Sequence, residues 1–80
     1  MKIEHIGIAV KDLGISNDLF EKLLGAKPYK EEQVESEGVR TSFFEVGESK
    51  IELVGSEKKD SAIEKYLEKN REGIHHIAFD

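Results

Sequence analysis

The sequence of 80 residues has no cysteine, no tryptophan and a single proline. Without cysteine the chain can form neither a disulfide nor a thiolate metal site. Basic residues are also scarce: 12 Lys and Arg stand against 17 Asp and Glu, and the net charge of −5 argues against a module that neutralises nucleic-acid phosphates. No apolar run approaches the roughly 18 residues of a membrane span. We therefore expect an acidic, soluble, cytoplasmic protein with neither nucleic acid nor membrane as a partner.

The first ten residues alternate in polarity and carry Glu4 and His5, which does not fit a secretory signal peptide. A chain of this length forms one small domain and buries only about 60% of the surface that it exposes when unfolded. The core is therefore expected to be marginal unless another chain or module completes it.

The apolar pattern predicts a βαβββ order within residues 1–55. The expected strands are 2–10, 29–36, 39–46 and 50–54. The helix between them is predicted to start at the N-cap Asp12 and to end at Gly25. Its core-facing stripe is expected to contain Ile15, Leu19, Phe20, Leu23 and Leu24.

Residues 56–72 are predicted to form a linker and a second helix, and residues 73–80 another strand. Ser61 and Glu64 have the spacing of a capping box at the start of that helix. The segment Ile3–Ile8 (IEHIGI) resembles Ile74–Phe79 (IHHIAF), and equivalent positions are 71 residues apart (74 − 3). Such a repeat predicts that a second βαβββ unit begins at residue 73 and is cut off after its first strand.

Three residues form a candidate metal set. His5 and His76 occupy equivalent places in the repeat, each close to small residues, and Glu52 lies on the more polar face of strand 50–54. Two imidazoles and a carboxylate on three strands suit a first-row divalent ion. Half-buried, hydrogen-bonded histidines and a solvated glutamate are the competing interpretation. Strand alternation places His75 opposite to His76, in a structural or supporting role.

Other chemistries find little support in the sequence. There is no glycine-rich phosphate loop and no cysteine nucleophile. Ser42 lies in no recognisable Ser–His–Asp pattern.

Four segments, residues 5–13, 20–25, 50–53 and 73–79, together resemble the methylmalonyl-CoA epimerase family of the vicinal oxygen chelate (glyoxalase-like) superfamily. The resemblance implies an α+β fold of paired βαβββ modules around a concave metal site. It also implies a divalent ion, Co²⁺ or Mn²⁺, held by two His and two Glu or Gln ligands. By position, His5, Glu52 and His76 match three of the four ligands, and the fourth belongs to the second module.

The function implied by this resemblance is that of an isomerase. It would interconvert (2R)- and (2S)-methylmalonyl-CoA through a metal-stabilised enolate, with one group removing the α-proton and another returning it. A carboxylate that has been assigned to catalysis in some members is matched here by Thr41, with Glu45 nearby, so the resemblance does not identify the acid and base.

Two further functions stay open within the superfamily: a non-catalytic ligand-binding module, and a glyoxalase-like lyase. A fragment without activity is a third possibility. We also expect a homodimer, in which His5 and Glu52 of each chain would complete the ligand count. Strand 74–79 would then compete for the strand at residues 2–10 or swap into the partner.

Overall fold

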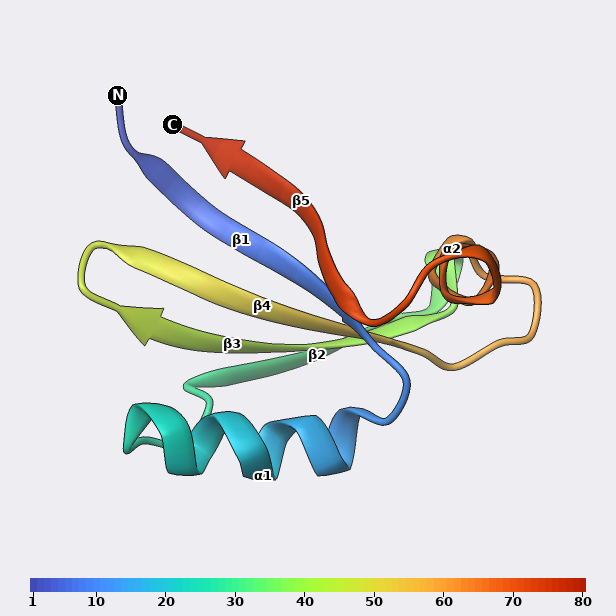
Figure 1. Cartoon of the computed structure of the whole chain (residues 1–80), viewed down its shortest axis with the longest axis horizontal. Coiled ribbons are helices and arrows are strands. Elements are labelled where there is room, and N and C mark those ends of the chain that lie inside the picture. Colours follow the sequence, from blue (N-terminus) through green and yellow to red (C-terminus); the bar gives the residue numbers. More distant parts are fainter.

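The computed structural model describes all of residues 1–80 and confirms the βαβββ order, which a helix and a fifth strand follow (Figure 1). The elements are β1 (Ile3–Val10), α1 (Leu13–Leu24), β2 (Lys30–Val34), the 3₁₀ helix η1 (Glu35–Glu37), β3 (Val39–Val46), β4 (Ser49–Ser56), α2 (Ala62–Lys69) and β5 (Gly73–Phe79).

All five strands form one mixed sheet in the order β2-β3-β4-β1-β5. β1 is parallel to β4 and antiparallel to β5, and the other pairs are antiparallel. β2 and β5 are therefore the two edges, as the charged character of residues 29–36 predicts for β2. Both chain ends lie close together, at the ends of β1 and β5 (Figure 1).

One face of the sheet packs on α1, which runs beneath it in Figure 1. The buried residues on this side are Val10, Phe44 and Leu53. The five apolar residues that were predicted to form one core-facing stripe on the helix divide into a packed group and an exposed group. Phe20 and Leu24 pack on the sheet, whereas the others are exposed: Ile15 (69%), Leu19 (59%) and Leu23 (71%). A helix only 12 residues long on a single sheet turns one narrow stripe inward, and Leu13 shares it with Phe20 and Leu24.

The opposite face is covered only in part. α2 packs Ile63 against Ala9, Val39 and Val54. Figure 1 shows this helix at one end of the sheet. The other end of this face therefore has no helix over it, and the candidate metal ligands lie there.

The predicted caps are confirmed. The Asp12 side chain accepts a hydrogen bond from the Ile15 N–H at 3.0 Å, and Gly25 ends α1 in the left-handed region at φ 76°. Ser61 accepts from the Glu64 N–H at 3.0 Å. Neither helix has the length and apolar character needed to cross a membrane.

The second strand is shorter than expected. It ends at Val34, and η1 replaces residues 35 and 36 of the predicted strand. Gly38 closes this turn at φ 66°, a conformation that favours glycine.

β5 pairs with β1 of its own chain, and the repeat explains the register. Ile6 lies opposite Ile77, its equivalent 71 residues later. On either side of this pair, His5 is opposite Ala78 and Gly7 is opposite His76. These pairs are related by a local two-fold axis through Ile6 and Ile77. Strand 73–79 thus occupies the edge of β1 that a second copy of the chain was expected to use. The division of the chain at residues 55 and 72 stays a prediction.

Candidate metal centre

Three adjacent strands bring the predicted ligands together on the uncovered face. β1 supplies His5, β4 supplies Glu52 and β5 supplies His76. The two Nε2 atoms are 3.0 Å apart. Glu52 Oε1 lies 3.5 Å from His5 Nε2 and 3.4 Å from His76 Nε2. The half-buried side chains therefore point three donor atoms at one point, and both histidines also have hydrogen-bond partners within the chain.

Gly7 makes this convergence possible. It lies between Glu52 and His76 in the sheet register. A Cβ at residue 7 would overlap the imidazole ring of His76. The ring therefore lies across the backbone of β1 and reaches His5 only because residue 7 has no side chain. Gly7 is one of the small residues that the sequence places beside the histidines, and the space that it leaves is filled by the ring of His76.

Two β-bulges place a supporting residue next to each histidine. The β1–β5 register shifts at Glu4 and again at His75, which are equivalent positions in the repeat. Glu4 Oε1 lies 2.6 Å from His5 Nδ1, and His75 Nδ1 lies 3.0 Å from His76 Nδ1. The prediction that His75 points away from His76 is wrong, because the bulge breaks the alternation on which it depended.

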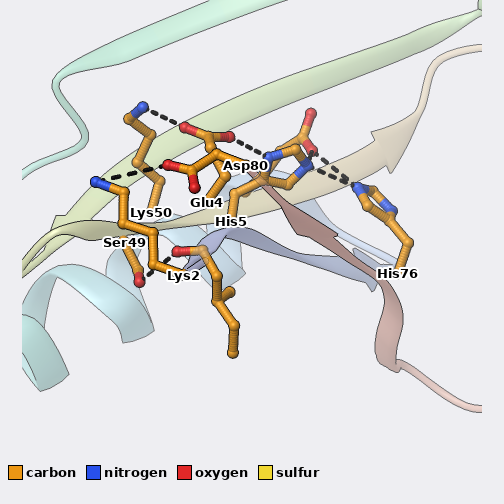
Figure 2. Close-up of polar contacts among 9 residues, drawn as sticks. Lys2, Glu4, His5, Ser49, Lys50, His76 and Asp80 are labelled. Atoms are coloured by element: carbon orange, nitrogen blue, oxygen red, sulfur yellow. Dashed lines mark hydrogen bonds and ion pairs between the residues drawn. The ribbon is translucent and has the colours of Figure 1, made fainter.

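Glu4 is held by a second partner. Figure 2 shows the contacts running from Lys50 through Glu4 and His5 to His76. The hydrogen bond from the Lys50 ammonium, and then that from His5, lower the pKa of the Glu4 carboxyl from 4.5 to about 2. The same contact raises the pKa of Lys50. Glu4 is therefore an anion at neutral pH and accepts the Nδ1–H of His5, which leaves the Nε2 lone pair facing the centre.

The donor set fits a divalent ion. A point about 2 Å from all three donor atoms exists within their triangle, which matches metal–nitrogen and metal–oxygen distances of about 2.0–2.2 Å. A histidine ligand that donates its other N–H to a carboxylate is also the usual arrangement around a metal. His5, Glu52 and His76 could therefore hold an ion, with further positions open to other ligands.

Residue-type reasoning predicted the three candidate ligands but missed the contacts of Glu4 and Lys50 and the packing of His76 over Gly7. The repeat contained a signal for Glu4, since it is equivalent to His75 and precedes the first ligand directly. The Lys50 contact depends on the parallel register of β1 and β4, which the sequence does not reveal. Thr41 is buried on the same face, whereas Glu45 is exposed.

Together the fold and the donor set define a class: a βαβββ module that carries a candidate divalent-metal centre on the open face of its sheet. A sequence profile of the glyoxalase/bleomycin resistance protein/dioxygenase superfamily matches residues 4–80. The chain belongs to this superfamily.

Similar proteins include the uncharacterised YqjC of Bacillus subtilis, which is 38% identical over 78 residues, or 98% of this chain and 56% of that protein. Human mitochondrial methylmalonyl-CoA epimerase is 32% identical over 80 residues, or 99% of this chain and 46% of that protein. The epimerase of Streptomyces coelicolor, solved with 2-nitronate-propionyl-CoA, superposes with a TM-score of 0.91 at 36% identity, covering 99% of this chain and 59% of that one. The chain thus spans about half the length of these relatives.

Proposed function

We propose that this chain is the metal-binding module of an acyl-CoA epimerase that interconverts the (2R) and (2S) forms of methylmalonyl-CoA. The convergence of His5, Glu52 and His76 on one point is the observation that carries the proposal. The likeness to methylmalonyl-CoA epimerases over nearly the whole chain supports the choice of substrate.

The three ligands would hold Co²⁺ or Mn²⁺, since mixed imidazole and carboxylate donors suit both ions. When bound, such an ion acts as a Lewis acid toward the oxygens of an acyl group. Glu52 adds a negative charge that offsets part of the charge of the ion. Glu4 keeps the proton of His5 on Nδ1, so that Nε2 stays free to bind.

The proton transfer itself requires other groups. An imidazole nitrogen that binds the ion has its lone pair engaged, so neither histidine serves as the general base through that nitrogen. The base and the acid are therefore assigned to neither histidine.

We also infer a homodimer. Its interface is now placed at the free edge of β5, because β1 already pairs with strands of its own chain on both sides. β5 has a free edge, and Ile74 (58%), Ile77 (46%) and Phe79 (61%) are exposed along it. A second copy that pairs there would cover this edge and its apolar side chains. Exchange of β5 between two copies would preserve the same centre.

Deuterium exchange tests the proposed reaction. The chain, loaded with Co²⁺, is incubated with (2R)-methylmalonyl-CoA in D₂O, and α-deuterium is followed by mass spectrometry. We expect metal-dependent incorporation that is abolished in Glu52→Ala. Incorporation no faster than in buffer with Co²⁺ alone would contradict the proposal for this chain, and metal binding without exchange would favour a ligand-binding module.

A further inference from the structure

Tyr66 of α2 contacts the strand that carries the ligand His76. Its hydroxyl donates a hydrogen bond to the Ile74 carbonyl at 3.2 Å. Its ring centre lies 4.7 Å from that of His75, and the planes of the two rings are 82° apart. Between α2 and the sheet is a cavity of about 190 Å³, and His75 and His76 form part of its lining. Tyr66 therefore holds the start of β5 against α2 right beside the metal centre (Figure 1).

Both contacts of Tyr66 lie at the β-bulge of β5. Ile74 pairs with Ile8 and His76 pairs with Gly7, so His75 is the extra residue between them. Such a residue is left out of the ladder of sheet hydrogen bonds, and other contacts must fix it. The bond to the Ile74 carbonyl fixes the backbone before the bulge, and the ring contact fixes the side chain of His75.

The orientation of His75 matters because its Nδ1 atom lies 3.0 Å from Nδ1 of His76. When Nε2 of His76 binds an ion, its Nδ1 atom carries the proton and donates it in a hydrogen bond. Nδ1 of His75 can accept this bond if its lone pair points at His76. The direction of the His75 ring therefore decides whether the ligand is held in place.

The repeat supports this interpretation, since both halves of the centre follow one plan. In the first half, Lys50 from β4 holds Glu4, which contacts Nδ1 of the ligand His5. In the second half, Tyr66 from α2 holds His75, which contacts Nδ1 of the other ligand. Each ligand thus has a bulge residue directly before it in the sequence, and a residue of another element fixes that bulge residue.

We propose that Tyr66 is a positioning residue of the metal centre, which fixes His75 at the bulge and thereby holds the His76 imidazole with Nε2 directed at the ion. The proposal rests on the metal-binding part of the proposed function. Tyr66 acts through His75 and is not itself a ligand. The packing of α2 and the affinity for the ion therefore depend on one another.

Three variants separate this role from a general effect on the helix. Tyr66→Leu removes the ring and the hydroxyl but keeps an apolar side chain beside Ile63 in the core cluster under α2. Tyr66→Phe keeps the ring, and water can replace the hydroxyl at the exposed residue Ile74. Leu67→Ala is the matched control, because Leu67 packs on the same cluster and its loss loosens α2 without removing the Tyr66 ring.

Calorimetric titration with Co²⁺ measures the affinity of each variant. We expect Tyr66→Leu to bind about tenfold more weakly, at the lower end of the usual effect of an outer partner. Tyr66→Phe should stay within about twofold of wild type. Leu67→Ala should bind as wild type does, although it melts at a lower temperature. In a chain that already carries His75→Ala, Tyr66→Leu should cause no further loss, because the residue through which it acts is gone.

NMR of the metal-free chain gives a second readout, which does not depend on the ion. Cε1 is the ring atom of His76 that would lie nearest to a Cβ at Gly7. Wild type should therefore show a nuclear Overhauser effect between the Hε1 proton of His76 and the α protons of Gly7. We expect this signal to weaken in Tyr66→Leu and to stay unchanged in Tyr66→Phe and Leu67→Ala.

Unchanged Co²⁺ affinity in Tyr66→Leu would overturn the role of Tyr66 and leave the proposed function intact. An equal loss in Leu67→Ala would also overturn it, because loosening of α2 would then explain the effect. So would losses that add up when Tyr66→Leu is combined with His75→Ala. If wild type binds no Co²⁺, the proposed metal site fails, and the signal between His76 and Gly7 still decides whether Tyr66 positions the ring.

Discussion

At the scale of single residues, the centre depends as much on a missing side chain as on the ligands. His76 reaches His5 across Gly7, and the Nε2–Nε2 distance of 3.0 Å requires that path to be open. The fit of the donors is therefore sensitive to residues that never touch an ion.

Gly7→Ala is expected to weaken Co²⁺ binding about tenfold or more, because the new Cβ displaces the His76 ring. Affinity is measured by calorimetric titration, and circular dichroism checks the fold. Gly14→Ala is the matched control: its Cβ meets only Asp12 Oδ1, at an ordinary 3.4 Å. It should leave affinity unchanged and stabilise α1 by up to about 1 kcal/mol. Equal affinities in the two variants would contradict the assigned role of Gly7.

Glu4→Gln is expected to lower the affinity for Co²⁺ about 10- to 100-fold, the usual effect of removing an outer partner of a histidine ligand. The amide is a weaker acceptor for the Nδ1–H of His5, so the tautomer that presents Nε2 is less favoured. Nitrogen-15 NMR of the imidazole reports that tautomer directly. Glu48→Gln, at an exposed turn, serves as the control. An unchanged tautomer in Glu4→Gln would show that the contact does not orient His5.

At the scale of elements, the ion pair between Glu4 and Lys50 joins β1 to β4 and makes stability depend on pH. The folded pKa of Glu4, about 2, lies below its ordinary value of 4.5. Its contribution is therefore fully present above about pH 4.5 and is lost as the pH falls toward 2. The raised pKa of Lys50 has the corresponding effect at high pH. The contribution of protonated Lys50 to stability is lost only when the pH rises above 10.5 and through the folded pKa of Lys50.

Thermal unfolding of wild type and Lys50→Met between pH 2 and pH 7 tests this. We expect the variant to melt at a lower temperature above about pH 4.5 and the two curves to converge toward pH 2. Lys2→Met removes two looser ion pairs, with Glu48 at 3.7 Å and with Asp80 at 3.9 Å, and should show no such convergence. A difference that stays constant over the whole range would contradict the pKa assignment.

The elements were largely predictable from the sequence because local signals decide them: alternation in β1, the caps Asp12 and Ser61, and the turn glycines. Faces were predicted less well. The exposure of Ile15, Leu19 and Leu23 depends on how α1 lies on the sheet, which a periodic pattern does not fix. The position of His75 depends on a bulge that alternation cannot anticipate. The convergence of the two histidines was predictable because the repeat marks both, whereas the cavity beside them forms only when α2 packs on the sheet.

At the scale of the whole molecule, the sheet is closed at neither edge. β2 is protected by charged side chains, whereas β5 leaves apolar ones exposed. The local two-fold axis through Ile6 and Ile77 indicates where more structure would fit: against the free edge of β5, as β4 pairs with β1.

Light scattering at micromolar concentration is expected to give the mass of a dimer for wild type. Ile77→Lys and Phe79→Lys should shift it to a monomer, because a buried, unpaired lysine at the shared edge is unfavourable. Leu23→Lys, on the exposed stripe of α1, should leave the dimer intact. Dissociation by the α1 variant and not by the β5 variants would place the interface on α1 instead.

The central claim is that one divalent ion binds to His5, Glu52 and His76, and a calorimetric titration with Co²⁺ tests it most directly. We predict saturable binding of one ion per chain, lost in His76→Ala and retained in His75→Ala, since His75 supports the site without being one of its ligands. The account would be contradicted if wild type showed no saturable Co²⁺ binding, or if His76→Ala bound Co²⁺ with undiminished affinity.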